Sequence, residues 1–150
     1  MSNNELDNQV SEYYTTWREL ITIYGDYAKT LGLSYSALQV LTAIYNNSDI
    51  CTQKNISQST FLPKQTVNAI MTGFLKQGII DLSEIESDRR TKAVHFTKIG
   101  EEYSEKIIPK IKNAQRKAME DLSENQRAAL VENTKLFVEN LQKYIYEQDN

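Results

Sequence analysis

Two groups of polar side chains in the middle of the sequence have the types and spacing to recognise a nucleic acid. Lys64, Gln65 and Asn68 stand at helical spacing beside a stripe of apolar residues. The amide of Gln65 or Asn68 can form two hydrogen bonds with adenine, and Lys64 can reach guanine or a phosphate. The basic segment 89–92, Arg-Arg-Thr-Lys, suits the negative potential of a narrow minor groove. Taken alone, the first group could equally be a solvated helix face, and a basic loop such as the second is more often a solvated hairpin tip.

The sequence contains no comparable pattern for catalysis or metal binding. The sequence has one histidine, His95, and one cysteine, Cys51. It lacks the HExxH, CxxC and GxxxxGK[ST] patterns that hold metals or phosphates. We therefore expect no enzymatic activity, no cofactor and no metal site. His95 is interpreted as a partly exposed strand residue, and redox sensing through Cys51 as the less favoured alternative.

The charge distribution also favours a nucleic-acid partner. The net charge is -3, but residues 52–98 carry seven Lys and Arg against four Asp and Glu. Residues 1–51 carry two basic residues against six acidic ones, and residues 99–150 carry eight basic residues against ten acidic ones. The positive charge is thus concentrated in the segment that holds both polar groups, and the location of charge matters more than its total.

Two helices are predicted to position the first group. A short helix over residues 52–59 turns Ile56 inward, and a second helix has Pro63 at its first position and ends at Gly78. The inward face of the second helix is expected to be Val67, Ile70, Met71, Phe74 and Leu75, and its outward face Lys64, Gln65, Thr66, Asn68, Thr72 and Lys76.

A change of hydrophobic period after Ile79 predicts a β-hairpin that carries the second group. Apolar and polar residues alternate over residues 80–84, and a polar tip over residues 86–92 leads to a second strand over residues 93–96. A flexible, basic tip of this kind is the wing that accompanies a DNA-reading helix.

Long helices are predicted on both sides of this region. The first covers residues 6–30, and Ser34 is expected to cap a helix that residues 46–49 stop. After the hairpin, Thr97 is expected to cap a helix that Pro109 bends, and Ser123 with Gln126 forms a capping box before the last helix. The apolar stripe of the helix after Thr97 is predicted to be Ile99, Tyr103, Ile107, Ile111, Ala114 and Ala118.

The expected fold is mainly α with a small β-hairpin wing, a winged helix-turn-helix over about residues 34–98 within a single domain of residues 1–150. Helices over about 6–30 and 99–147 are expected to mediate dimerisation. The sequence has no run of about 18 apolar residues, and its amino terminus, MSNNELDNQV, is polar and acidic. We therefore expect no membrane insertion or export, and a cytoplasmic location.

Residues 88–100, DRRTKAVHFTKIG, and residues 62–68, LPKQTVN, followed by Gly78-Ile79-Ile80, are the most specific motifs of the chain. They resemble the wing and the recognition helix of the MarR (multiple antibiotic resistance regulator) family, and the resemblance covers nearly the whole chain. Phe96 replaces the family's leucine, Phe61 a frequent turn glycine, and Asn55 and Gly73 frequent charged residues. The resemblance implies a homodimer that binds operator DNA and is often released by a small aromatic ligand or an oxidant. It also implies an ion pair between Asp88 and Arg90 that fixes the wing.

Together these observations predict a sequence-specific transcription regulator, a repressor that binds a near-palindromic operator in double-stranded DNA as a homodimer. The alternative is a winged-helix protein–protein adaptor that does not bind DNA. The residues expected to contact DNA are Pro63, Lys64, Gln65, Thr66, Asn68 and Thr72 on the recognition helix, and Asp88, Arg89, Arg90 and Lys92 on the wing.

Aromatic residues are concentrated at the two ends of the chain. Six of the nine tyrosines lie in the first and last helices, together with Trp17. Core or dimer packing is the simplest interpretation. The alternative is that some of them bind a small aromatic effector, and the residues predicted for that pocket are Tyr13, Trp17, Tyr24 and Tyr35.

Overall fold

The computed structural model describes residues 3–47, 50–86 and 88–147. The expectations for Ser48, Asp49 and Ser87 lie outside these residues. The chain divides into two compact units, Met1–Lys106 and Ile107–Asn150. The elements are α1 (Asn3–Thr30), α2 (Tyr35–Asn46), α3 (Gln53–Thr60), α4 (Lys64–Lys76), β1 (Ile80–Ile85), β2 (Asp88–Phe96), α5 (Lys98–Glu120) and α6 (Glu124–Glu147). This order confirms the mainly helical fold with a small hairpin.

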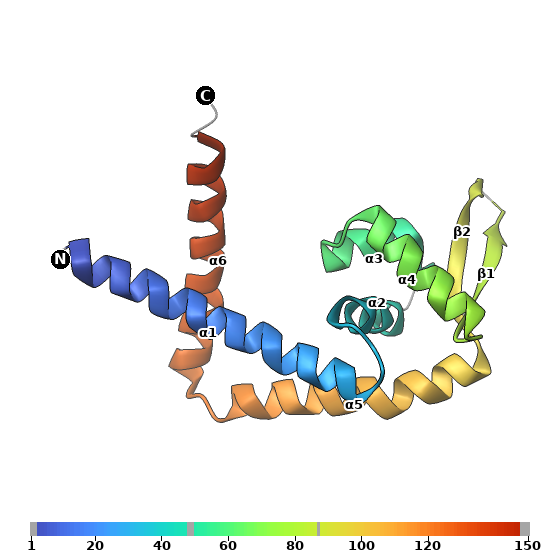
Figure 1. Ribbon diagram of the computed structural model, residues 1–150, viewed down its shortest axis with the longest axis horizontal. Coiled ribbons are helices and arrows are strands. Elements are labelled where there is room, and N and C mark those ends of the chain that lie inside the picture. Colours follow the sequence, from blue (N-terminus) through green and yellow to red (C-terminus); the bar gives the residue numbers. More distant parts are fainter. Residues whose placement is uncertain (1–2, 48–49, 87, 148–150) are drawn as a thin grey trace. The chain divides into compact units, whose positions relative to one another are not determined.

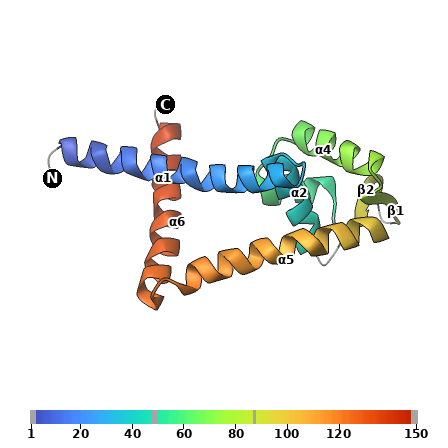
Figure 2. The same cartoon turned by 60° about the horizontal axis from the view of Figure 1, so that its bottom comes forward.

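The core of the first unit lies between α2, α3, α4 and the hairpin. Helices α2, α3 and α4 contact one another, and the hairpin contacts all three (Figure 1). Figure 2 shows the same cluster from a second direction, with the hairpin again at the carboxyl end of α4. The side chains of Leu41, Ile56, Val67, Phe74 and Ile80 are fully buried there. Burial of these apolar groups fixes which face of α4 remains in water.

The ends of α2, α3 and α4 follow their capping residues. Ser34 Oγ accepts a hydrogen bond from the Ala37 N–H at 3.1 Å, as predicted for the start of α2. Thr52 and Asn55 form a capping box at the start of α3, a role for Asn55 that the sequence had not indicated. Helix α4 begins at Lys64 with Pro63 as its N-cap, so the predicted start was one residue early.

The buried face of α4 is narrower than predicted. Val67, Met71 and Phe74 are buried, whereas Ile70 is half-buried and Leu75 is 37% exposed. Leu75 lies about 80° around the helix from Val67 at 3.6 residues per turn, at the edge of the buried face. The assignment of Leu75 to the core was therefore wrong.

The hairpin is longer, and its turn is shorter, than predicted. The strands pair antiparallel from Ile80↔Phe96 to Glu84↔Lys92, and the next pair is Ile85↔Asp88. Residues 89–91 thus have no partner residue on β1, and they form an extended β-bulge in a strand that begins at Asp88. The prediction of a polar tip over residues 86–92 was wrong, because the pairing of β1 with β2 continues almost to the turn.

The base of the hairpin is fixed to the end of α4 by Thr97 and Gly100. The Thr97 N–H donates to Ile79 O at 3.0 Å, and its hydroxyl donates to Gly78 O at 2.5 Å. The same hydroxyl accepts a bond from the Gly100 N–H at 3.1 Å, which confirms Thr97 as the cap of α5. A Cβ atom at Gly100 would lie 1.9 Å from Ile79 O, so only glycine fits there.

Helix α5 runs through Pro109 without interruption, and the bend predicted there stays a prediction. Its buried face contains Gly100, Ser104, Ile107 and Ile108. The predicted stripe was wrong at three positions: Ile99 is 66% exposed, and Ala114 and Ala118 are also exposed. Ile107 is buried as predicted, and Tyr103 and Ile111 are half-buried, but at the start of the helix Gly100, and not Ile99, meets the backbone of Ile79.

The second unit contains the rest of α5 and all of α6. Ser123 N–H donates to Gln126 Oε1 at 2.9 Å, and Gln126 N–H donates to Ser123 Oγ at 3.3 Å, which confirms the predicted capping box. Within the described ranges, no helix is both long and apolar enough to cross a membrane.

Candidate nucleic-acid interface

The start of α4 presents free polar side chains to solvent. Lys64, Gln65 and Asn68 are exposed, as predicted, and their side chains make no hydrogen bond or ion pair within the part of the chain that the structure describes. Lys64 and Asn68 are four residues apart and therefore lie on one side of the helix. These donors and acceptors are free to bind base edges or phosphates.

The other residues predicted on this helix are placed differently. Thr66 is half-buried one turn before Ile70, at the edge of the outward face, and its contact with DNA stays a prediction. Thr72 is exposed, but its hydroxyl donates to the carbonyl of Asn68 at 2.8 Å. Pro63 is exposed at the N-cap position. The free polar groups are thus concentrated in the first two turns of α4.

Side chains from α3 hold the start of α4 in place. Gln53 Nε2 donates to Lys64 O at 3.1 Å, and Ser57 Oγ donates to Leu62 O at 2.7 Å. Thr60 Oγ1 accepts a bond from the Leu62 N–H at 3.3 Å. The sequence analysis missed these positioning residues. Their only signal is that short polar side chains lie on the helix before the turn.

The wing is organised around the carboxylate of Asp88. Its Oδ1 accepts a bond from the Arg90 N–H at 3.0 Å, and its Oδ2 accepts one from the Thr91 hydroxyl at 2.7 Å. The bond from Thr91, followed by that from Arg90, holds the pKa of Asp88 below its ordinary value. The implied ion pair between Asp88 and Arg90 was wrong, because Asp88 binds the backbone of Arg90. Among the described residues, the guanidinium of Arg90 has no ion-pair partner.

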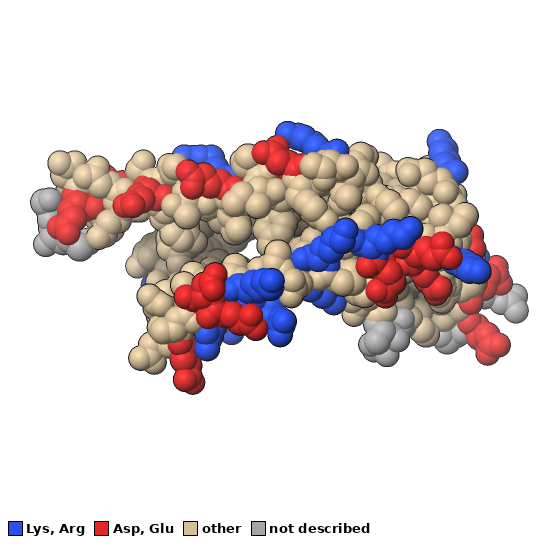
Figure 3. Space-filling view, turned by 90° about the horizontal axis from the view of Figure 1, so that it is seen from below, with Lys and Arg blue, Asp and Glu red and all other residues tan. Residues whose placement is uncertain are grey.

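The two other basic residues of the wing differ from Arg90. Lys92 Nζ lies 2.9 Å from Glu84 Oε1 in a solvent-exposed pair between opposite strand positions. Arg89 belongs to β2, and its side chain lies outside the described part of the structure. The face of the molecule in Figure 3 mixes acidic and basic side chains. Arg90 and the start of α4 are candidates for binding phosphate because their exposed basic side chains have no ion-pair partner among the described residues.

Cys51 lies beside β2, because its carbonyl accepts a hydrogen bond from the Val94 N–H at 2.8 Å. His95 is an exposed residue of β2, and its Nε2 lies 2.7 Å from Ser83 Oγ. Cys51 is only 3% exposed, and burial raises the pKa of its thiol above the ordinary value. A buried, protonated thiol reacts slowly with oxidants. No group of three or more His, Cys, Asp or Glu side chains in the described ranges could hold a metal ion.

Two of the four predicted effector-binding residues meet in the structure. The rings of Tyr24 on α1 and Tyr35 on α2 are stacked with centroids 5.8 Å apart. Burial, followed by the neighbouring Tyr24, raises the pKa of Tyr35. Tyr13 and Trp17 are exposed, and each packs edge-to-face against Tyr14. Trp17 is seven residues before Tyr24, which is about 10 Å along the helix axis.

Residues 31–91, which cover α2, α3, α4 and most of the hairpin, match the model of the MarR family. The HTH-type transcriptional regulator SarZ of Staphylococcus epidermidis is 26% identical over 136 residues, which cover 89% of this chain and 83% of SarZ. Residues 31–91 are therefore a MarR-family segment of the chain.

Several solved structures have the same fold as this chain. The regulator NMB1585 of Neisseria meningitidis superimposes with a TM-score of 0.79 at 24% identity, over 93% of this chain and 98% of NMB1585. MepR of S. aureus, solved as a complex with DNA, superimposes with a TM-score of 0.68 at 16% identity, over 94% of this chain and 98% of MepR. The DNA binding of BpsR of Bordetella bronchiseptica is regulated by 6-hydroxynicotinic acid. BpsR superimposes with a TM-score of 0.68 at 18% identity, over 87% of this chain and 98% of BpsR.

Proposed function

We propose that this protein is a transcription regulator that binds duplex DNA through α4 and the wing. The observation that carries the proposal is the row of free, exposed side chains of Lys64, Gln65 and Asn68 at the start of α4. The unpaired guanidinium of Arg90 belongs to the same unit. In this arrangement α4 reads bases in the major groove while Arg90 senses the minor groove. The names of SarZ and of the MepR complex support this function.

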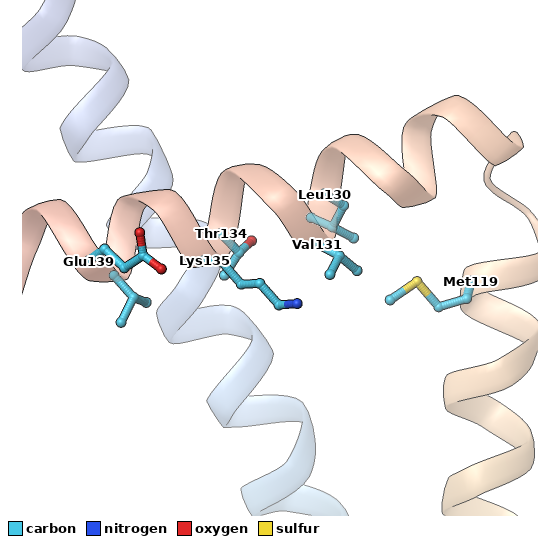
Figure 4. A pocket seen from close by; sticks show the side chains of 7 residues that line it. Met119, Leu130, Val131, Thr134, Lys135 and Glu139 are labelled. Carbon is cyan, nitrogen blue, oxygen red and sulfur yellow. The ribbon is translucent and has the colours of Figure 1, made fainter.

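The proposed DNA-binding form is a homodimer. Helix α1 exposes Leu6, Val10, Trp17, Leu20 and Ile23, and α6 exposes Leu130, Val131, Leu136, Val138, Leu141, Tyr144, Ile145 and Tyr146. An open groove of about 510 Å³ lies between Met119 at the end of α5 and Leu130 and Val131 of α6 (Figure 4). Apolar surface of this extent is typical of a protein interface. A second copy of the chain would cover it and place two α4 helices about one DNA turn, roughly 34 Å, apart.

We further propose that the dimer represses transcription and that a small aromatic acid releases it. A dimer bound across a near-palindromic operator prevents other proteins from reaching the same DNA. The effector is proposed to bind beside Tyr13, Trp17, Tyr24 and Tyr35, and the regulation of BpsR by 6-hydroxynicotinic acid supports an aromatic acid as its class. Titration of 6-hydroxynicotinic acid and phenolic carboxylates would change both Trp17 fluorescence and operator affinity. The absence of any response across this set would contradict the effector proposal.

The decisive experiment selects binding sites from a random duplex pool with the purified protein and then measures affinity between about 50 and 200 mM salt. We expect an inverted repeat and a steep loss of affinity with salt, because phosphate contacts release counterions. Lys64→Ala should reduce the salt slope by about one. Lys110→Ala on α5 removes another exposed lysine and is the matched control.

An adaptor that binds only proteins would give the opposite result. No inverted repeat would be selected, and weak binding to duplex would be the same for Lys64→Ala and Lys110→Ala. The cytoplasmic location predicted from the sequence also depends on this experiment, since a transcription regulator works in the compartment that contains its DNA.

A further inference from the structure

Phe61 is unusually exposed for a large apolar residue. Its side chain is 92% exposed, the highest value among the exposed large hydrophobic residues of the described chain. It connects α3 to α4, two residues before Pro63. In this position it gains none of the stabilisation that burial gives a phenylalanine.

The backbone of Phe61 is also strained. Its φ and ψ of 57° and 16° are in the left-handed region, and no other described residue except glycine has a positive φ. Gly32 and Gly78 take the other positive values. Glycine adopts this conformation without the steric cost that a Cβ atom brings. A glycine here would remove both the strain and the exposed ring, so neither folding nor solubility accounts for phenylalanine.

The turn that carries Phe61 is rigid. Hydrogen bonds from Ser57 to Leu62 O and from Leu62 N–H to Thr60 Oγ1 close it on both sides of the ring. The bond from Gln53 to Lys64 O connects the next residues to α3. The ring is therefore held outward, and binding it would require little further ordering of the chain.

The surroundings of Phe61 favour DNA over protein as its partner. Gln58, Ser59 and Lys64 are exposed polar neighbours in sequence. A protein partner would need a broader apolar patch around its anchor residue. In the major groove, the 5-methyl group of thymine is the apolar group available, and a phenylalanine can contact it. Gln65, four residues later, is proposed to enter the same groove.

We propose that Phe61 is a specificity residue that contacts the 5-methyl group of one thymine in each half of the operator. This inference rests on the proposed function, because it requires α4 to lie in the major groove. It extends the reading surface beyond α4 to the turn that precedes it.

Replacing single operator thymines with deoxyuridine, which lacks only the 5-methyl group, tests this contact without changing the protein. We expect one thymine in each half-site at which the substitution weakens binding by the parent protein about fourfold, the affinity equivalent of one buried methylene-sized group. Phe61→Gly should bind the thymine operator more weakly and should be indifferent to deoxyuridine at that position. Its thermal unfolding temperature should equal or exceed that of the parent, because the strain is removed.

Ile99→Ala is the matched control, since it removes another exposed apolar side chain of the same unit and should keep the parent's sensitivity to deoxyuridine. The inference is overturned if Phe61→Gly binds the operator as tightly as the parent, or if it still loses affinity with the same deoxyuridine. It is also overturned if no thymine position is sensitive in the parent. Failure of the parent to select any duplex would instead overturn the proposed function itself.

Discussion

Gln65 and Arg90 are both exposed polar residues of the first unit, yet the structure gives them different tasks. Gln65 projects from a regular helix whose start is fixed by Gln53. Arg90 projects from the bulge in β2, and only its backbone is held, by Asp88. A side chain on a fixed helix can align with one base edge, whereas one on a bulge can follow the shape of a groove. Each residue should therefore affect binding in its own way.

Comparing Gln65→Ala with Arg90→Ala separates these two tasks. Gln65→Ala should cost about 1 to 3 kcal/mol on the selected operator and relax base preference at one position of each half-site. Arg90→Ala should weaken binding to many sequences and reduce the salt slope by about one. Measuring affinities for a panel of single-base operator variants at two salt concentrations would check both. Equal behaviour of the two variants would show that the assignment of helix and wing is wrong.

Asp88 supports the wing through its hydrogen bonds to Arg90 and Thr91. Asp88→Ala should lower operator affinity, because the Arg90 N–H and the Thr91 hydroxyl both lose their acceptor. Asp88→Asn is the matched control, since its carbonyl oxygen can still accept the bond from Arg90 and should preserve most of the affinity. Thermal unfolding of both variants should resemble that of the parent, because Asp88 is exposed to solvent. Parent-like affinity of Asp88→Ala would show that the wing needs no such support.

At the scale of elements, the hairpin, α4 and α5 meet at Thr97 and Gly100. Thr97 bonds to the end of α4 and caps α5, while Gly100 allows α5 to pass the carbonyl of Ile79. The orientation of the wing relative to α4 therefore depends on a contact between backbones. Gly73, in contrast, lies inside α4, where an added Cβ would meet no atom closer than 4.0 Å.

These two glycines should respond to alanine in opposite directions. Gly100→Ala should destabilise the fold by about 1 to 3 kcal/mol or more, because the new methyl group overlaps a backbone oxygen. Gly73→Ala should stabilise it by roughly 0.5 to 1 kcal/mol, since alanine favours the helix. Chemical denaturation of both variants measures the difference. A parent-like Gly100→Ala protein would mean that the start of α5 can move away from Ile79 at little cost.

The sequence predicted elements well where a local signal exists. Ser34, Thr97 and the pair Ser123 and Gln126 cap the helices at which they were expected, because a cap depends on residues within one turn. The prediction of a polar tip failed at Asp88, because the bulge that follows it depends on pairing with β1. The prediction of the apolar stripe failed at Ile99, whose exposure depends on the position of Ile79. Such contacts join residues far apart in the chain, and hydrophobic spacing contains no information about them.

At the scale of the whole molecule, α1 and α6 each expose a series of large apolar side chains. Each face belongs to one of the two units and is exposed along several turns of its helix. The family model covers residues 31–91, between these faces. The candidate DNA-reading elements are therefore contained in a segment that is separate from the proposed subunit contact.

Removal of α6 tests the proposed subunit contact. A chain cut before Ser123 loses the exposed apolar residues of α6 and should sediment as a monomer or aggregate. Val138→Glu, a milder change on the same face, should weaken the dimer while α6 remains folded. The matched control is Glu132→Gln, an exposed polar residue of α6. A well-folded dimer of the shortened chain would contradict the role of α6.

The bulge in β2 has a consequence for how this protein can diverge. Residues 89–91 have no partners on β1, whereas the pairs from Glu84↔Lys92 to Ile80↔Phe96 keep a fixed register. An insertion or deletion of one residue within the bulge would leave every one of those pairs, and the buried Val94, in place. Descendants of this gene can therefore change the reach of the wing through small length mutations while they keep the same folded core.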